Sequence, residues 1–151
     1  MQTQLSIQLH NRKIFHHFLS KFTNEQLNCI PEGFNNNIIW NVAHTLVTHQ
    51  SLVYRLSGLS MHIPEEWVAL FAKGTKPTRE ITPNEVKEID QAMFSTYELL
   101  VSDMESGVFK EFNPYTTSTT MQINNVETAQ TFALFHDGLH TGSVLALAKL
   151  V

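Results

Sequence analysis

The chain has 151 residues, 42% of them apolar and 16% charged, which is the length and balance of one globular domain and is too apolar for a disordered chain. Its formal net charge is −4 and its ten Lys and Arg residues form no cluster, so binding to nucleic acid is not expected. The sequence shows no signal-peptide pattern and no apolar run of membrane-spanning length, which predicts a cytoplasmic protein without contact to a membrane.

The first half of the chain contains two stretches with the apolar spacing of a helix. One runs from about Gln4 to Phe22 and has Ile7 on its predicted buried side. The next begins at the asparagines 35–37, which are good helix caps, and runs to about Gly58. This second helix is apolar on two sides, which predicts either a central position in the fold or a homodimer face.

A crossover leads to the third long helix. Residues Pro64 through Ala72 have the pattern of a short amphipathic helix within this crossover. Thr82, with Glu85 three residues later and Pro83 between them, has the pattern of a capping box. The third long helix is therefore expected to start at Pro83 and to end near Gly107.

The last part of the chain combines a long connection with a fourth helix. Residues 107–125 are long for a loop in a compact domain, and we expect this segment to act as a lid over a functional site. Asn124 is the predicted cap of a helix that continues to Val151. The sequence thus predicts a single all-α domain over residues 1–151, a four-helix bundle with a long crossover and a short extra helix.

Eight histidines accompany a single cysteine, Cys29, which we expect to be a buried apolar residue. His136 and His140 lie four residues apart in the fourth helix, so both imidazoles leave its apolar side and can hold one metal ion. The alternative is two ordinary core histidines, each with its own hydrogen bond. Asp137 lies off this side and is expected to be a cap or a surface residue. Because no His or Glu follows His140, a third ligand has to come from upstream.

The second helix offers two candidates for that third ligand, His44 and His49. Five residues apart, they point about 140° away from one another, so they cannot both face one ion. Periodicity favours His49, which shares a stripe with Val42 and Leu46, while His44 shares a side with Trp40. The residues alone leave this choice open. The other four histidines show no ligand spacing and are expected at the surface, namely His10, His16, His17 and His62.

Two segments carry a resemblance to a known family. They are Asn-Ile-Ile-Trp-Asn-Val-Ala-His-Thr-Leu at 37–46 and Phe-His-Asp-Gly-Leu-His-Thr-Gly at 135–142, and they resemble the DinB-like family of metal-binding four-helix proteins, which includes YfiT-type enzymes. The resemblance spans nearly the whole chain. It implies that His44, His136 and His140 bind a divalent ion, Zn, Ni, Mn or Fe, with His49 as a supporting or alternative ligand.

The resemblance also implies a function. Such a site fits a metal-dependent thiol S-transferase or hydrolase whose substrate is a small molecule, including low-molecular-weight thiols. Tyr54, Tyr115 and Glu127 are candidates to reach its pocket. The competing hypothesis is a non-catalytic bundle that binds a small molecule or a partner and keeps its histidines as interior polar residues. A homodimer is compatible with both hypotheses.

Overall fold

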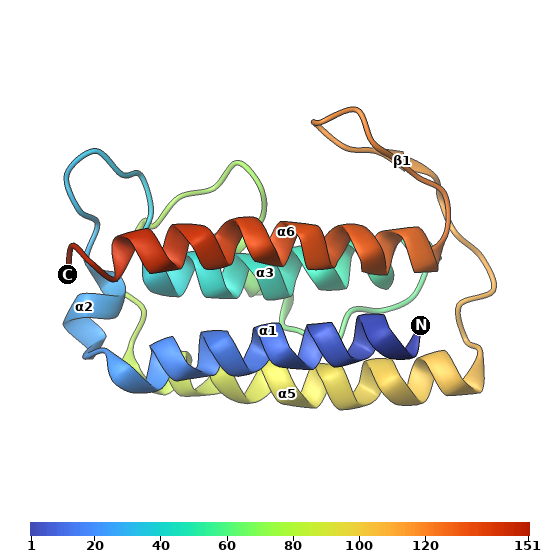
Figure 1. The fold of residues 1–151 in the computed structure, drawn as a ribbon, viewed down its shortest axis with the longest axis horizontal. Coiled ribbons are helices and arrows are strands. Elements are labelled where there is room, and N and C mark those ends of the chain that lie inside the picture. The colour runs from blue at the N-terminus through green and yellow to red at the C-terminus, as the bar shows by residue number, and fades with distance from the viewer.

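The computed structural model describes residues 1–151, which form six α-helices, one 3-10 helix and a two-stranded hairpin. Four long helices form a bundle (Figure 1): α1 (Gln2–Lys21), α3 (Ile38–Val53), α5 (Pro83–Ser106) and α6 (Val126–Leu147). The shorter elements are α2 (Asn24–Asn28), η1 (Arg55–Ser57), α4 (Glu65–Phe71), β1 (Tyr115–Thr116) and β2 (Gln122–Ile123). The predicted all-α fold is confirmed.

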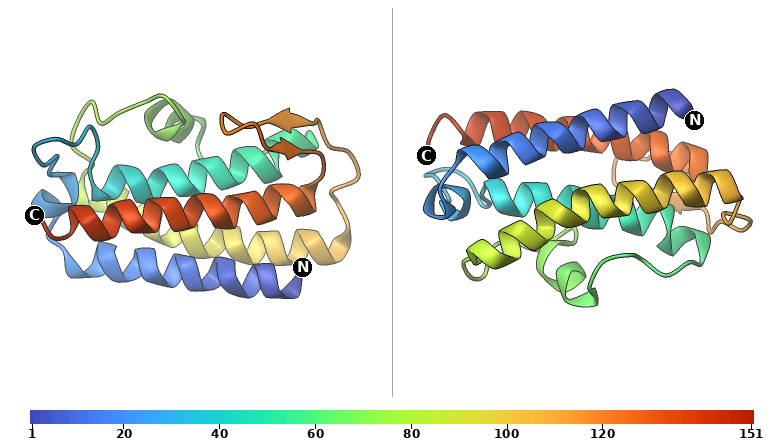
Figure 2. Two further views of the ribbon diagram at one scale, coloured as in Figure 1. Left: turned by 45° about the horizontal axis from the view of Figure 1, so that its top comes forward. Right: turned by 90° about the horizontal axis from the view of Figure 1, so that it is seen from below.

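The directions of the helices explain one of the two long connections, the crossover between α3 and α5. Helices α1 and α6 run in one direction and α3 and α5 in the other, as the colour progression shows (Figures 1 and 2). Because α3 and α5 are parallel, the chain must return along the bundle between them, and this crossover carries η1 and α4. The hairpin β1–β2 precedes α6 and lies beside the end of the bundle where α3 ends and α6 begins (Figure 2).

Helix α3 occupies the centre of the bundle. All of its residues except Thr48 and Ser51 are buried, and it packs chiefly against α6. The apolar character on two sides therefore follows from a central position, and no dimer face is needed to explain it. No helix of this fold combines the length and the apolar character that crossing a membrane requires.

The helix starts follow local capping chemistry. The side chain of Thr82 accepts from the Glu85 N–H and the Glu85 carboxylate accepts from the Thr82 N–H, as the capping box predicts. Asn37 caps α3. The cap of α6 is Asn125 and not Asn124, because the chain is still leaving the hairpin at Asn124 and the Asn125 side chain accepts from the N–H of Thr128. This helix also ends at Leu147, after which the last residues form a turn.

Three expectations about burial were wrong. Ile7 is exposed, because the inner face of α1 carries the polar residues Gln8 and Arg12, both fully buried. Cys29 is exposed, because it caps the C-terminal end of α2, a short surface helix that the apolar pattern did not predict. Asp137 is buried rather than at the surface, because it points from α6 toward α1.

Candidate metal centre

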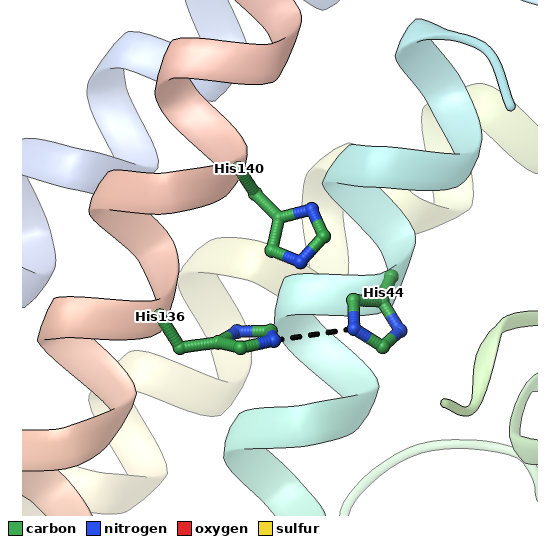
Figure 3. Close-up of side chains that lie close together, drawn as sticks. All are labelled: His44, His136 and His140. Carbon is green, nitrogen blue, oxygen red and sulfur yellow. Dashed lines mark hydrogen bonds between the residues drawn. The ribbon is translucent and has the colours of Figure 1, made fainter. Parts of the chain in front are cut away.

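Three histidines meet at the interface between α3 and α6. His44 projects from α3 toward His136 and His140 of α6 (Figure 3), and one ring nitrogen from each lies within 4.8 Å of the other two. The Nε2 atoms of His44 and His136 are 3.2 Å apart. Nitrogens that bind one ion at ~2.0–2.1 Å in tetrahedral geometry lie roughly 3.3 Å from one another. The group therefore has the size needed to hold one metal ion.

The His44 ring is held in one orientation and one tautomer. Its Nδ1 lies 2.6 Å from the main-chain carbonyl oxygen of Phe71, which can only accept, so Nδ1 carries the proton and Nε2 presents a lone pair to the other histidines. The indole of Trp40 stacks on the ring with a centroid separation of 4.7 Å. The hydroxyl of Thr48 lies 3.3 Å from Nε2, at the edge of the cluster.

His140 is oriented in the same way by a buried asparagine. The Nδ2 amide of Asn41 donates to Oδ1 of Asn36 and to the carbonyl of Asn37, which identifies Oδ1 of Asn41 as the acceptor. This oxygen lies 2.8 Å from Nδ1 of His140. Nδ1 of His140 therefore donates, and its Nε2 is left with a lone pair, as metal-binding histidines commonly are.

His136 lacks such a partner. Its Nδ1 is buried without a hydrogen bond, and its Nε2 faces the lone pair of His44. A proton on Nε2 would leave Nδ1 as an unpaired buried acceptor, and a proton on Nδ1 would place two Nε2 lone pairs against each other. An ion between the Nε2 atoms removes that repulsion. The three ring nitrogens, two of them on rings whose tautomer is fixed, thus fit a divalent metal ion.

The electrostatics favour the neutral imidazoles that metals require. Burial lowers the pKa of His136 to about 3, with smaller contributions from His140 and His44. Burial also lowers the pKa of His140 to about 4, and it lowers the pKa of His44 against the opposing effect of the Phe71 carbonyl. All three rings are therefore uncharged at neutral pH, so a metal ion does not have to compete with the second proton of an imidazolium.

A pocket of about 430 Å³ opens beside His44 and His136. The long connection 107–125 contributes Tyr115, Thr117 and Ser118 to its wall, so this loop reaches the site as its length suggested. Of the other candidates, Tyr54 instead donates to Asp103 at 2.8 Å, and Glu127 does not line the pocket.

His49 lies outside the cluster. Its Nε2 is 2.8 Å from Oε1 of Gln130, and the Gln130 amide donates to Gln8, so this oxygen accepts and Nε2 of His49 donates. Both His44 and His49 are buried because α3 is buried on all sides, which is why periodicity could not separate them. The structure brings His44, not His49, to His136 and His140. As expected, His10, His16, His17 and His62 are exposed, and His62 lies beside Asp103.

The burial of His49 makes the metal-free protein sensitive to acid. Burial, followed by the charge of Arg12, lowers its pKa to about 3 from the ordinary 6.5. Between these values the unfolded chain binds a proton that the folded chain does not, so stability falls as the pH drops below 6.5. We expect His49→Gln to remove about 2 kcal/mol of the stability loss between pH 7.5 and 5.0. Urea unfolding of the wild type and of His49→Gln at pH 7.5 and 5.0 measures this difference. Equal losses of stability in the two proteins would contradict the low pKa of His49.

The fold and the cluster define a class of protein, an all-α bundle in which the second and fourth long helices bring three histidines to one point beside a pocket. The sequence model of the DinB superfamily matches residues 9–144, and the chain belongs to that superfamily. The resemblance seen in the sequence is thereby confirmed.

A solved structure shares the fold. It is described as the conserved protein of locus from Enterococcus faecalis, and it is similar over 99% of this chain and 95% of its own, with a TM-score of 0.61 and 14% sequence identity. At that identity the similarity concerns the fold alone. A comparison with curated proteins found no match.

Proposed function

We propose that this protein is a metal-dependent enzyme, a thiol S-transferase or a hydrolase of small molecules, in which His44, His136 and His140 bind one divalent ion, Zn, Ni, Mn or Fe. The observation that carries the proposal is the convergence of three ring nitrogens within 4.8 Å at the wall of a 430 Å³ pocket. Three neutral imidazoles leave coordination positions free, as in catalytic sites rather than closed structural ones.

The residues of this chain have separate parts in that chemistry. A bound ion would lower the pKa of a water or a thiol that binds to it. The Phe71 carbonyl and the Asn41 amide keep the rings of His44 and His140 aimed at one point. Thr48 and Ser51 line the pocket, and the Ser51 hydroxyl, which donates to the Val47 carbonyl, can accept a hydrogen bond from a substrate.

The test is to compare metal-loaded and chelator-treated protein. Purified protein is expected to hold close to one divalent ion per chain by elemental analysis. Loaded protein, but not chelated protein, should turn over at least one pair from a panel of thiols (cysteine, glutathione) with an electrophile, or one ester or amide. Metal without turnover across the panel would support the non-catalytic binding bundle instead. Absence of metal uptake would contradict the whole proposal.

Asn41 is expected to act as a positioning residue for the metal centre. Asn41→Leu removes the acceptor that orients His140, and loss of such an outer partner typically weakens metal affinity by roughly 10–100-fold. Asn41→Asp keeps an acceptor oxygen and should recover most of the affinity. Calorimetric titration of both variants with Zn²⁺ measures the effect. Equal affinities in the two variants would show that Asn41 has only a structural part.

We also propose that the protein forms a homodimer through the outer face of α6. Between Glu127 and Lys149 the only charged residue of this helix is Asp137, which is buried, so the outward face carries no charge. Phe135 and Leu139 on that face are 56% and 55% exposed, so the face presents apolar surface without charge. Sedimentation should show a dimer for the wild type and a monomer for Leu139→Glu. A monomeric wild type at all concentrations would overturn this proposal.

A further inference from the structure

We infer that the pocket beside the three histidines binds an anionic small molecule, a compound with an apolar body and a carboxylate or phosphate group. The inference concerns the substrate class of the proposed enzyme and rests on that proposed function. It comes from the charges, the apolar surface and the hydroxyls that line the pocket.

The ionised side chains of the pocket wall are of one sign. Arg55 and Lys73 line it, and no Asp or Glu does. The chain as a whole has fourteen acidic residues against ten Lys and Arg and a net charge of −4, so the charge of the pocket wall is opposite in sign to the net charge of the chain. A concave surface with one sign of charge attracts ligands of the opposite sign.

The nearest acid does not cancel this charge. Arg55 Nη2 lies 3.5 Å from the Glu65 carboxylate, whose side chain is 82% exposed, and such surface pairs contribute little energy. Glu65 is not part of the pocket wall, and the hydrogen bond to it uses only Nη2. The rest of the guanidinium fork is free for a carboxylate or a phosphate, which it matches in geometry.

The proposed metal centre adds to the positive potential. Its three imidazoles are neutral donors, and no carboxylate is near enough to join them as a ligand. An ion held there would therefore keep its full charge and would be the largest charge of the site. His44 and His136 belong to both the cluster and the pocket wall, so a bound anion lies within reach of both positive regions.

The rest of the wall defines the body of the ligand. Val47, Leu52, Leu56 and Phe132 supply apolar surface, and Thr48 and Ser51 supply hydroxyls. Ligand sites are commonly of this kind, mostly apolar with a few polar groups that fix orientation, and a volume of about 430 Å³ is within their usual range. An apolar molecule with one anionic group matches all three kinds of surface.

The experiment measures binding to chelator-treated protein, so that no metal contributes to the affinity. The probes are 4-phenylbutyrate, 4-phenylbutyl phosphate and the neutral 4-phenylbutanamide. Their binding is measured by ligand-observed NMR or calorimetry. We expect at least one anion to bind about 10-fold or more tightly than the amide, with an advantage that shrinks at high salt. The stronger of the two anions identifies the carboxylate or the phosphate as the preferred group.

Three variants locate the effect. Arg55→Gln and Lys73→Gln should each reduce the preference for the anion over the amide several-fold. The matched control is Lys87→Gln, an exposed lysine on α5 outside the pocket, which should keep the wild-type preference. Equal binding of anion and amide in the wild type, or equal effects of all three variants, would overturn the inference.

The outcome is separable from that of the proposed function. Metal uptake and turnover combined with equal affinity for anion and amide would remove this inference and leave the enzyme proposal standing. A preference for the anion in a protein that takes up no metal would remove the enzyme proposal and leave the anionic pocket.

Discussion

Replacing His136 by alanine is expected to abolish high-affinity binding of a divalent ion. The substitution removes one of three nitrogens, so its cost should exceed the roughly 10–100-fold effect of losing an outer partner such as Asn41. Calorimetric titration with Zn²⁺ should therefore show a loss of more than about 100-fold. Because Nδ1 of His136 has no hydrogen bond in the folded protein, the metal-free variant should be nearly as stable as the metal-free wild type.

The same variant separates stabilisation by the ion from ordinary packing. A ligand present at 100 times its dissociation constant stabilises a folded protein by about 2.7 kcal/mol, so Zn²⁺ should raise the melting temperature of the wild type. The rise should be absent in His136→Ala and intact in His10→Ala, a histidine exposed on α1. His49→Gln should also keep the rise, which would decide between His44 and His49 as the third ligand. Unchanged affinity in His136→Ala would exclude the metal centre.

The long helices and most of their caps could be predicted from the sequence, because they depend on interactions within a few residues. Thr82 and Glu85 bond to one another across a single turn, and Asn37 bonds to the N–H of Trp40 three residues later. The His136–His140 pair is equally local, since one helix fixes the relative position of residues four apart. These features needed no knowledge of how the helices pack.

The third histidine of the site depended on packing and could not be predicted from periodicity. An amphipathic pattern identifies the buried side of a helix only when another side meets water, and α3 has almost no exposed side. His44 and His49 are therefore both buried, but they contact different residues of α6. His44 meets His136, and His49 meets Gln130. Only the family resemblance favoured His44.

The buried charges of α1 and α6 were missed for a related reason. Arg and Asp are rarely buried without a close ion pair, and Asp137 was expected as a cap or a surface residue because it lies off the apolar side of its helix. In the structure Arg12 is fully buried with its Nε and Nη2 unpaired. Asp137 accepts from Gln8 at 3.4 Å and from Asn11 at 3.5 Å, both long hydrogen bonds. The two charged residues lie near each other and form no direct ion pair.

This arrangement predicts an unequal response to removing the two charges. Burial raises the pKa of Asp137 to about 7 against the charge of Arg12, so its carboxyl group can take up a proton near neutral pH at little cost. Burial lowers the pKa of Arg12 to about 10, so the guanidinium keeps its proton and remains charged at pH 7. The Asp137 carboxyl group has a pKa of 3.8 in the unfolded chain and of about 7 in the folded one, so its ionisation favours the unfolded chain at pH 7, and Asp137→Asn should stabilise the metal-free protein by up to about 4 kcal/mol.

Arg12→Met should instead cost about 1 kcal/mol or below, because Asp137 then becomes neutral and methionine fills an apolar site beside Met93. Urea unfolding at pH 7 measures both variants. In Arg12→Met the pKa of Asp137 rises further above its unfolded value, so stability should fall as the pH increases from neutral toward that pKa, whereas the wild type should change less over this range. The double variant should be more stable than Arg12→Met alone at pH 7, since asparagine then replaces a carboxyl group that is neutral in the folded chain and ionised in the unfolded one. A loss of stability in Asp137→Asn would contradict the raised pKa of Asp137 and would mean that its carboxylate is ionised and compensates the charge of Arg12.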